Sequence, residues 1–507
     1  MMEFKPTALH ALSIVSKEHE SADLIVMGLC SDSRHVQPGD LFIARDGVNH
    51  QGIDFIEQAA SQGAVVAVVD HAVTQSCDLA VFSIPVFRID DLKNKVGVLA
   101  AQMLDNPSHK MILVGITGTN GKTSCAHYIA QALAALGQKA ALIGTVGNGF
   151  PEALKEATHT TPDSIKLQQL LADFYVQGAD AVVMEVSSHA LDQGRISGVE
   201  FDAVALTNLS RDHLDYHGSM QAYADAKSQL FLSKSHDANN EVVLPRIVLN
   251  ADDEFGCQLA KALEQNQQSF SRYSVHSTKS TDVSVKHSEL SPEGVVLDIA
   301  LPSGDIHFKA AVVGDFNIAN LLLVVSVLVQ LGQSNTKIET AMAQVSAVPG
   351  RMECLMVEGF PTAVIDYAHT PDALEKALLA ARKHCKQELW VVFGCGGDRD
   401  TGKRAEMAAI AEKFADKIIV TSDNPRTESA DEIIKMIMRG FSCSKNVIQV
   451  VERQDAIAKA VKLAGSDDLV LIAGKGHEDY QEIMGIKYPF SDKKVLESLM
   501  GGFANDA

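Results

Sequence analysis

The chain has 507 residues, and at about 150 residues per domain this length predicts roughly three domains and excludes a single small binding module. Lys and Arg total 44 against 64 Asp and Glu, and the formal net charge of −20 argues against nucleic acid or an anionic membrane surface as the main partner. With 46% hydrophobic and 21% charged residues the composition is that of a globular protein, so anionic ligands must be held by locally concentrated positive charge.

Cysteine spacing and hydropathy indicate the compartment. The 8 cysteines show no C-x-x-C spacing, which favours reduced thiols over a zinc or redox site. Residues 1–15 contain no continuous apolar segment of the kind found in a signal peptide. The most apolar stretch, 318–331, is interrupted by polar residues and is shorter than the about 20 residues that span a bilayer. We therefore expect a cytoplasmic protein without membrane insertion.

The first predicted domain, residues 1–106, is a small α/β unit. Apolar runs at Leu41–Ala44 and Ala64–Val69 predict strands, and the spacing over Phe55–Ala60 predicts a helix. The pattern breaks at the Asp-Asn-Pro sequence of residues 105–107, which predicts the end of this domain.

The central predicted domain, residues 107–348, begins with a strand, a glycine-rich loop and a helix. These are the apolar run Met111–Ile116, the segment GTNGKTS at 118–124 and the helical spacing of Ala126–Leu136. Three more apolar runs predict a parallel sheet covered by helices: Ala181–Val186, Ala203–Leu206 and Arg246–Leu249. Between residues 280 and 313 the apolar residues alternate with a period of two, which predicts an inserted β-hairpin or meander.

The third predicted domain, residues 349–507, is a second open α/β sheet of the Rossmann-like kind. Strands are expected at Ala363–Ile365, Leu389–Phe393, Ile418–Val420 and Leu469–Ile472. Helices are expected to begin after Thr370 and after Ser429, since Ser429 and Glu432 have the spacing of a capping box. Ligands of such a sheet bind at the carboxyl ends of its strands, so the functional loops are expected there.

The loop at residues 118–124 has the features of a phosphate cradle. Its glycines allow backbone N–H groups to approach phosphates, Lys122 supplies a cation, and Thr123 can bind magnesium. It is a variant of the G-x-x-x-x-G-K-[ST] P-loop, because Ile116 stands where the first glycine is expected. The alternative without a function is an ordinary glycine-rich turn, but the flanking strand and helix favour nucleotide binding.

Several other strand ends carry polar residues. Glu185 ends a predicted strand and could hold magnesium beside the phosphate loop, although it could also be a capping or surface acid. His213 could join that metal site, although a lone histidine is more often structural. In the third domain three polar loops follow strands, at residues 394–400, 423–426 and 474–478, and their arginines could bind carboxylates in bidentate fashion or merely decorate turns.

Motifs along nearly the whole chain resemble those of the Mur ligases. They are GTNGKT, MEVSSH, TNLSRDHLDYHG, GDFNIANLL, PGRME, DYAHTPDALEKAL, GGDRDTGKR, DNPRTE and AGKGHEDYQ. The resemblance implies an α/β fold of three domains: a small N-terminal domain that binds a uridine diphosphate group, a central P-loop domain, and a C-terminal amino-acid-binding domain. It also implies an ATP-dependent amide ligase of peptidoglycan synthesis, in which ATP and Mg²⁺ convert a carboxylate into an acyl phosphate that an amine then attacks.

The resemblance implies roles for individual residues. The catalytic group is Lys122, Glu185, His213 and Lys227, and the metal ligands are Thr123, Glu185, His213 and Lys227 in a carboxylated form. The ATP-binding residues are Gly118, Thr119, Asn120, Gly121, Lys122, Thr123, Ser124, Asn317, Asn320, Arg351 and Asp366. Taken without the resemblance, Lys227 has the pattern of an exposed helical lysine.

Two further groups of residues are implied for the other substrates. The UDP-N-acetylmuramoyl dipeptide is expected at Ser31, Ser33, Val48, Asn49, His50, His159, Thr160, Thr161, Ser187, Gln193 and Arg195. meso-Diaminopimelate is expected at Arg399, Asp423, Asn424, Pro425, Arg426, Gly474 and Glu478. Arg426 would select this amino acid, because it can pair with the distal carboxylate, whereas lysine would present an ammonium group to it.

Three alternatives stay open from the sequence. Folylpolyglutamate synthase chemistry would use the same loop and acyl phosphate with a folate acceptor, although the first hundred residues and the DNPR segment argue against it. A P-loop kinase or switch ATPase would release phosphate without an amine. A catalytically silent binding protein is disfavoured by the presence of Lys122, Glu185, His213 and Lys227. We expect small-molecule substrates only, and a monomer.

Overall fold

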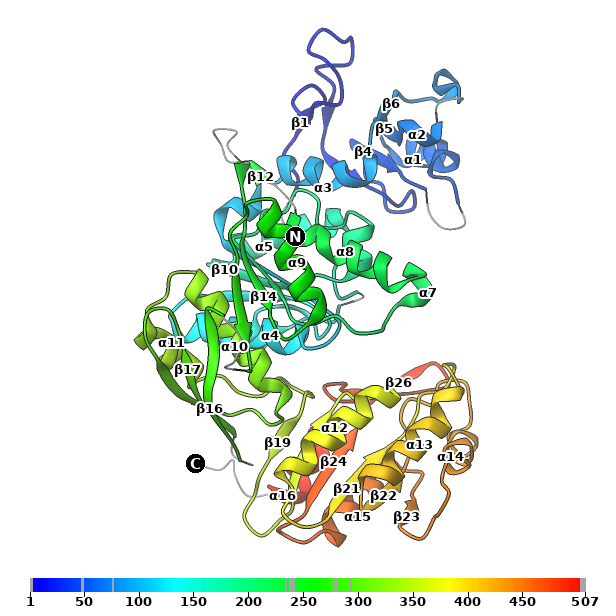
Figure 1. The fold of residues 1–507 in the computed structure, drawn as a ribbon. Coiled ribbons are helices and arrows are strands. Elements are labelled where there is room, and N and C mark those ends of the chain that lie inside the picture. The colour runs from blue at the N-terminus through cyan, green and yellow to red at the C-terminus, as the bar shows by residue number, and fades with distance from the viewer. Residues whose placement is uncertain are drawn as a thin grey trace. The chain divides into compact units, whose positions relative to one another are not determined.

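The computed structural model describes residues 3–46, 50–74, 77–157, 159–232, 235–236, 242–276, 281–291 and 294–501. The chain divides into two compact units, one formed by residues 1–273 and 326–333 and the other by residues 274–325 and 334–507. Both contain parallel sheets covered by helices, which confirms the predicted α/β class (Figure 1). Within the described residues, no helix is both long and apolar enough to cross a membrane.

The first unit begins with a short antiparallel pair, β1-β2, followed by a four-stranded parallel sheet of order β3-β4-β5-β6. Along β4 the side chains alternate between two cores: Leu41 and Ile43 pack with helix α3, and Phe42 and Ala44 pack with α1. Both faces of the sheet are therefore covered, as the continuous apolar runs predict. The elements are β1 (Thr7–Ala8), β2 (Ile25–Val26), β3 (Gly28–Cys30), β4 (Asp40–Ala44), α1 (Ile56–Gln62), β5 (Val66–Asp70), α2 (His71–Thr74), β6 (Val86–Ile89) and α3 (Leu92–Met103).

The same unit contains a larger sheet in which β15, β14, β11, β7, β10 and β8 are parallel neighbours and β9 is antiparallel to β8. Strand β7 lies inside this sheet and leads directly into the glycine-rich loop. The elements are β7 (Ile112–Thr117), α4 (Lys122–Ala135), β8 (Ala140–Ile143), β9 (Asn148–Gly149), α5 (Ser164–Val176), β10 (Ala181–Glu185), α6 (Ser188–Asp192), β11 (Ala203–Leu206), α7 (Leu214–His217), α8 (Met220–Leu232), β12 (Ser235–His236), β13 (Val242–Val243), β14 (Arg246–Asn250), α9 (Glu254–Gln265) and β15 (Ser271–Ser274).

The second unit contains the predicted meander. Antiparallel strands β16, β17 and β18 follow one another, and Val295, Leu297 and Ile299 are buried while their neighbours Val296 and Asp298 are only partly covered. This alternation confirms the period-two pattern. The elements are β16 (Val283–Ser291), β17 (Gly294–Ala300), β18 (Ile306–Ala310) and α11 (Asn335–Met342), and helix α10 (Phe316–Gln330) is shared, with residues 326–330 in the first unit.

The C-terminal sheet of the second unit has the order β19-β20-β24-β21-β22-β23, with only β19 antiparallel. Helices α12, α13 and α14 cover one face and α15 and α16 the other (Figure 1). The elements are β19 (Glu353–Leu355), β20 (Thr362–Asp366), α12 (Pro371–His384), β21 (Leu389–Phe393), α13 (Gly402–Phe414), β22 (Lys417–Val420), α14 (Ala430–Met438), β23 (Val447–Gln449), α15 (Arg453–Leu463), β24 (Leu469–Ala473), β25 (Tyr480–Ile483), β26 (Ile486–Pro489) and α16 (Asp492–Met500).

Two helix starts test the capping patterns. Helix α12 begins at Pro371, and the Thr370 hydroxyl accepts a hydrogen bond from the backbone N–H of Ala373, as an N-cap should. Helix α14 begins one residue after Ser429, where the sequence predicts it, but the Ser429 side chain makes no capping hydrogen bond. The Glu432 carboxylate instead accepts from Lys435, so the position of the helix is confirmed and the capping box is not formed.

Candidate active site

The glycine-rich loop turns sharply between β7 and α4. Gly118 has a φ of +146°, and a Cβ added there would lie 1.8 Å from the Thr207 hydroxyl, so no larger residue fits. Lys122 opens α4, and its ammonium group donates to the carbonyl oxygens of Gly118 (2.9 Å) and Thr119 (2.8 Å). The loop therefore holds a cation at a helix N-terminus, which is the arrangement that binds phosphate groups.

Glu185 lies beside this loop, as the sequence predicts. It ends β10, whose register pairs it with Ile116 of β7, and its side chain is buried. One carboxylate oxygen accepts from the Thr123 hydroxyl at 2.9 Å, and the other accepts from the backbone N–H of Thr145 at 2.8 Å. The carboxylate is thus held beside the first turn of α4 by its hydrogen bond with the Thr123 hydroxyl.

Lys227 is buried, which contradicts the exposed position that its sequence context alone predicts. It lies on α8 with 1% of its surface exposed, and its ammonium group donates to the Gly118 carbonyl at 2.9 Å. Burial, followed by the nearby charge of Lys122, lowers the pKa of Lys227 well below its ordinary value. The centre of the Tyr223 ring lies 4.7 Å from the Lys227 nitrogen. Burial raises the pKa of that tyrosine to about 12.

His213 lies in the loop that precedes α7. Its side chain is about half exposed, its φ of +52° is in the left-handed region, and its ring centroid is 4.8 Å from that of His189. The described residues contain no group of three or more His, Cys, Asp and Glu side chains close enough to hold a metal ion. The Thr123 hydroxyl and Glu185 carboxylate nevertheless offer the hard oxygen ligands that Mg²⁺ prefers, and a carboxylated Lys227 would add more.

Residues expected to contact the muramoyl dipeptide form a connected group. The Arg195 guanidinium donates to the Thr161 carbonyl (2.9 Å) and, through two nitrogens, to the side-chain oxygen of Gln193. Thr161 in turn donates its hydroxyl to the Glu185 carbonyl, and Ser187 caps helix α6. Burial lowers the pKa of Arg195. This group is therefore linked to the backbone of Glu185 at the end of β10.

The remaining residues predicted for this substrate are less closely connected. The Thr160 hydroxyl lies 3.1 Å from that of Thr145, whereas His159 and Ser31 are exposed. Ser33 is buried and donates to Gln58 at 2.8 Å, and the His50 ring packs edge-on against Phe55. Val48 and Asn49 lie outside the described residues.

The other predicted nucleotide-binding residues belong to the second unit. Asn317 and Asn320 are buried on α10, where the Asn320 side chain donates to that of Asn317 at 2.8 Å. The Arg351 guanidinium lies 4.8 Å from the centre of the Tyr367 ring. Burial raises the pKa of Asp366, although Arg351 acts in the opposite direction.

Loops at the carboxyl ends of β22 and β24 bring Asp423, Asn424, Gly474 and Glu478 together. The Asn424 side chain donates to the Glu478 carboxylate at 2.8 Å. Gly474 has a φ of +120°, and a Cβ there would lie 2.4 Å from an Asp423 carboxylate oxygen. The Arg426 guanidinium donates to the Gly397 carbonyl in the loop after β21, whereas Arg399 is exposed and Pro425 is buried.

Charged residues that the sequence did not single out support these loops. Lys475 is fully buried and donates to both Asn424 (3.0 Å) and Glu478 (2.8 Å). Arg404 is also fully buried and forms a bidentate pair with Glu428. Lys475 lies within the predicted 474–478 loop and Arg404 within the GGDRDTGKR segment, so the motifs contained the residues but gave no sign of their burial.

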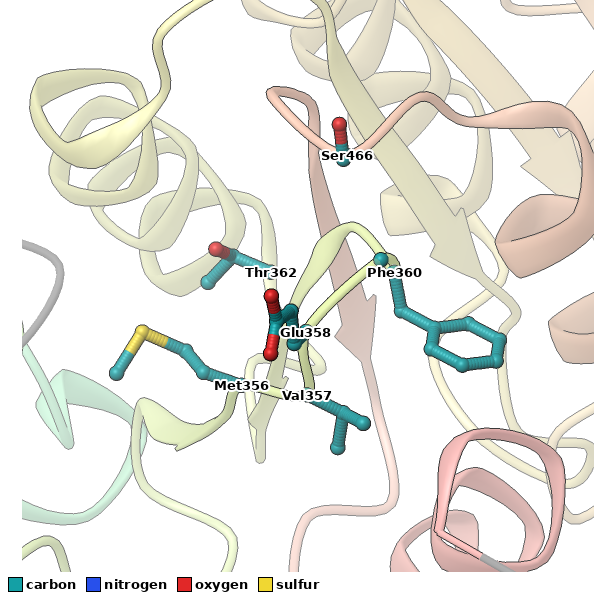
Figure 2. Close-up of a pocket in the computed structure, with 7 residues that line it drawn as sticks. Met356, Val357, Glu358, Phe360, Thr362 and Ser466 are labelled. Carbon is teal, nitrogen blue, oxygen red and sulfur yellow. The ribbon is translucent and has the colours of Figure 1, made fainter.

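A surface pocket of about 260 Å³ is separate from these predicted residues. It lies at the turn between β19 and β20 and is lined by Met356, Val357, Glu358, Gly359, Phe360, Thr362 and Ser466. Figure 2 shows the Met356 and Phe360 side chains extending in different directions on either side of Glu358. Glu358 is the one ionisable residue of this lining, so the pocket lacks the positive charge that an anionic substrate needs.

Comparison with known proteins decides the family. The Mur ligase family catalytic domain matches residues 26–103, the Mur ligase middle domain 116–328, and the Mur ligase glutamate ligase domain 350–476. A UDP-N-acetylmuramoyl-L-alanyl-D-glutamate–2,6-diaminopimelate ligase of Chromobacterium violaceum is 46% identical over 472 residues, which cover 93% of each chain. The chain belongs to the Mur ligase family.

Solved structures agree with membership of the Mur ligases. A solved structure of a UDP-N-acetylmuramoyl-L-alanyl-D-glutamate–2,6-diaminopimelate ligase matches with a TM-score of 0.73 and 31% identity, over 98% of this chain and 99% of that one. Folylpolyglutamate synthase of Mycobacterium tuberculosis, solved with ADP and AMPPCP, matches with a TM-score of 0.60 and 18% identity, over 79% of this chain and 94% of that one. At that identity the second likeness concerns the fold alone. The Mur ligase assignment makes this chain an ATP-dependent amide ligase.

Proposed function

We propose that this Mur ligase joins meso-diaminopimelate to UDP-N-acetylmuramoyl-L-alanyl-D-glutamate, with conversion of ATP to ADP and phosphate. The observation that carries the chemistry is the contact between Glu185 and Thr123, which fixes a buried carboxylate beside a cationic phosphate loop. The 46% identical relative named for this reaction supports the choice of substrates. In peptidoglycan synthesis the product would be a nucleotide-linked tripeptide.

The phosphate loop would bind ATP and promote phosphoryl transfer to the substrate carboxylate. Lys122 and the backbone N–H groups of residues 118–124 would hold the phosphates, with Asn317, Asn320, Arg351 and Asp366 at the nucleoside. Thr123, Glu185, His213 and Lys227 would hold Mg²⁺, which neutralises the charge that develops during transfer. The hydrogen bond between Thr123 and Glu185 would hold two of these groups together beside the loop.

Lys227 would act after reaction of its amine with carbon dioxide. An amine attacks carbon dioxide only in its neutral form, and burial beside Lys122 favours that form. The reaction forms an N–C bond and releases one proton, which converts a potential cation into a carbamate anion. A carbamate beside the Gly118 carbonyl and the phosphate loop could bind the metal that a lysine ammonium would repel.

The substrate that carries the carboxylate would bind along the first unit. Arg195, Gln193, Thr161 and Ser187 would hold the muramoyl dipeptide, since their hydrogen bonds connect them to Glu185. Ser31, Ser33, Val48, Asn49, His50, His159 and Thr160 would complete the site toward the uridine diphosphate end. We assign the uridine diphosphate end of this substrate, ATP and the amino acid to domains 1–106, 107–348 and 349–507 respectively, in a monomer that acts in the cytoplasm.

The amino acid would bind to the loops after β22 and β24. Asp423, Asn424, Gly474 and Glu478 would receive one end of diaminopimelate, with Arg399 and Pro425 at the margin. Arg426 would pair with the distal carboxylate, because a guanidinium binds a carboxylate through two parallel hydrogen bonds. A lysine substrate would place an ammonium group against this guanidinium, which disfavours lysine.

A substrate-exchange assay tests the proposal. The protein is incubated with ATP, Mg²⁺, the UDP-linked dipeptide and diaminopimelate, and phosphate and tripeptide are measured. Parallel reactions replace diaminopimelate by lysine, replace the dipeptide by a folate, or omit the amine. We expect phosphate release that depends on both diaminopimelate and the dipeptide; release without an amine would indicate a kinase or ATPase, and release with folate would indicate the related synthase.

A further inference from the structure

The guanidinium of Arg426 is held by two hydrogen bonds from different nitrogens. Its Nε donates to the Glu482 carboxylate at 3.2 Å, and its Nη1 donates to the Gly397 carbonyl at 2.8 Å. Both charged side chains are mostly buried, with 22% of the Arg426 side chain and 26% of the Glu482 side chain exposed to solvent. The two contacts, made by different nitrogens of one rigid group, fix the plane of the guanidinium.

Backbone contacts join the same two residues. The N–H of Arg426 donates to the Glu482 carbonyl at 3.0 Å, and the N–H of Met484 donates to the Arg426 carbonyl at 2.7 Å. Arg426 has a φ of +52°, a left-handed conformation that a non-glycine residue adopts only where its surroundings impose it. The β25–β26 hairpin therefore imposes the backbone conformation of Arg426 as well as the orientation of its side chain.

Glu482 also contacts a second residue of the predicted amino-acid pocket. Its N–H donates to the side-chain oxygen of Asn424 at 2.9 Å, and the Lys475 ammonium donates to the same oxygen at 3.0 Å. With its oxygen occupied twice, the Asn424 amide must direct its nitrogen toward Glu478, which accepts it at 2.8 Å. One residue of the hairpin thus contacts two pocket residues that lie two positions apart in the chain.

We propose that Glu482 is a positioning residue for diaminopimelate, which holds the Arg426 guanidinium in the plane that receives the distal carboxylate. The inference rests on the proposed function and adds a residue that lies outside the DNPR segment. Glu482 acts through Arg426, so its substitution should change recognition of the amino acid and leave the other two substrates unaffected.

Two conservative substitutions separate orientation from charge. Glu482→Gln keeps the length of the side chain and an oxygen that accepts from Arg426 Nε, but removes the negative charge. Glu482→Asp keeps the charge but is one methylene shorter and withdraws the oxygen from Nε. We expect Glu482→Asp to raise KM for diaminopimelate about ten-fold, the effect of losing about 1.4 kcal/mol of a charged hydrogen bond, and Glu482→Gln to raise it less than about three-fold.

Wild-type protein, both variants and Glu432→Ala as a surface control are assayed together, with KM for ATP and for the dipeptide measured alongside kcat and Tm. Glu432 contacts Lys435 on the exposed face of α14, so its loss should change none of these values. The positioning role would be overturned if KM for diaminopimelate stayed unchanged in both variants, or if Glu482→Gln raised it more than Glu482→Asp. It would also be overturned if KM for all three substrates rose to the same degree. A wild-type protein without diaminopimelate-dependent activity would contradict the proposed function instead.

Discussion

Arg453 and Asp492 form a bidentate ion pair in which neither side chain is exposed, with nitrogen–oxygen distances of 2.7 and 2.8 Å. The two residues begin helices α15 and α16. Arg453 also donates to the carbonyl oxygens of Ser422 and Ala473, at the ends of the strands that lead into Asp423 and Gly474. The pair therefore supports the loops of the predicted amino-acid pocket from within the core.

Asp492→Ala should lower the free energy of unfolding by about 3–5 kcal/mol, because it leaves the Arg453 charge buried without its partner. Urea unfolding followed by the fluorescence of Trp390 measures this, since Trp390 is the sole tryptophan and lies in β21 of the same sheet. The control is Asp372→Ala, which removes an exposed pair with Lys376 and should cost less than about 1 kcal/mol. Equal effects of the two substitutions would contradict the structural role.

Glu185→Gln should reduce kcat by about 10²–10³-fold, which is the typical effect of removing one electrostatic group that acts in the transition state. The amide is similar in size to the carboxylate, so the fold and Tm should change little. Steady-state kinetics at saturating Mg²⁺ measure the effect. A kcat within a few-fold of the wild type would show that Glu185 is a structural acid that merely accepts from Thr123 and Thr145.

Arg426→Ala should raise KM for diaminopimelate by at least about ten-fold, since a hydrogen bond between charged groups is worth about 1.5–3 kcal/mol. KM for ATP should stay within about two-fold. Arg426→Lys retains the charge but not the planar fork, and it should recover only part of the affinity. Loss of affinity for both substrates to the same degree would argue against a role in amino-acid selection.

Lys227→Ala should abolish amide formation, and short carboxylates such as acetate should restore part of it by occupying the place of the carbamate. Mass spectrometry of the native protein should detect one added carbon dioxide that the variant lacks. Because the lysine is buried at a cost to its charged form, Lys227→Met should keep or increase Tm while remaining inactive. An active Lys227→Met variant would contradict the carbamate.

His384 should make the second unit less stable in acid. Its Nε2 accepts from the Gly314 N–H at 3.0 Å, which leaves Nδ1 to donate to the Ser291 carbonyl at 2.9 Å, so the folded state needs the neutral ring. Burial lowers the pKa of His384 below its ordinary value of 6.5, while Asp315 and Lys383 act in opposite directions. The unfolded chain therefore binds the proton more readily, and stability should fall as the pH drops below about 6.5.

The variant His384→Gln tests this linkage. Its urea midpoint, followed through Trp390, should be lower than that of the wild type near neutral pH because the buried contacts are less well formed. Between about pH 7.5 and pH 5.5 it should also change less, because the titrating group is gone. Identical pH dependence in the two proteins would assign the acid sensitivity to other groups.

The sequence predicted most strands because buried parallel strands are continuous apolar runs, as in Ala203–Leu206 and Leu389–Phe393, whose bounds match β11 and β21. It also placed Glu185 beside the phosphate loop, since neighbouring parallel strands end at the same edge. It did not predict β8, and so the contact of Thr145 with Glu185 could not be foreseen.

Burial of charge was the second limit. The segments around three charged residues read as solvated helices and loops: Lys227, Lys475 and Arg404. Only the tertiary structure shows that these charged groups contact carbonyl or carboxylate oxygens away from water. The partnership of Arg426 with Glu482 depends on the pairing of a loop with a distant hairpin, for which neither residue gives a local signal.

Gly144 belongs to none of the motifs, but the position of Glu185 leaves no room there for a larger residue. It directly follows β8, and a Cβ at this position would lie 2.3 Å from the Glu185 carboxylate oxygen. A single added methyl group would therefore push that carboxylate out of place while leaving every motif residue intact. Gly144→Ala should therefore lower kcat to the same degree as Glu185→Gln, although it removes no side chain of the predicted site.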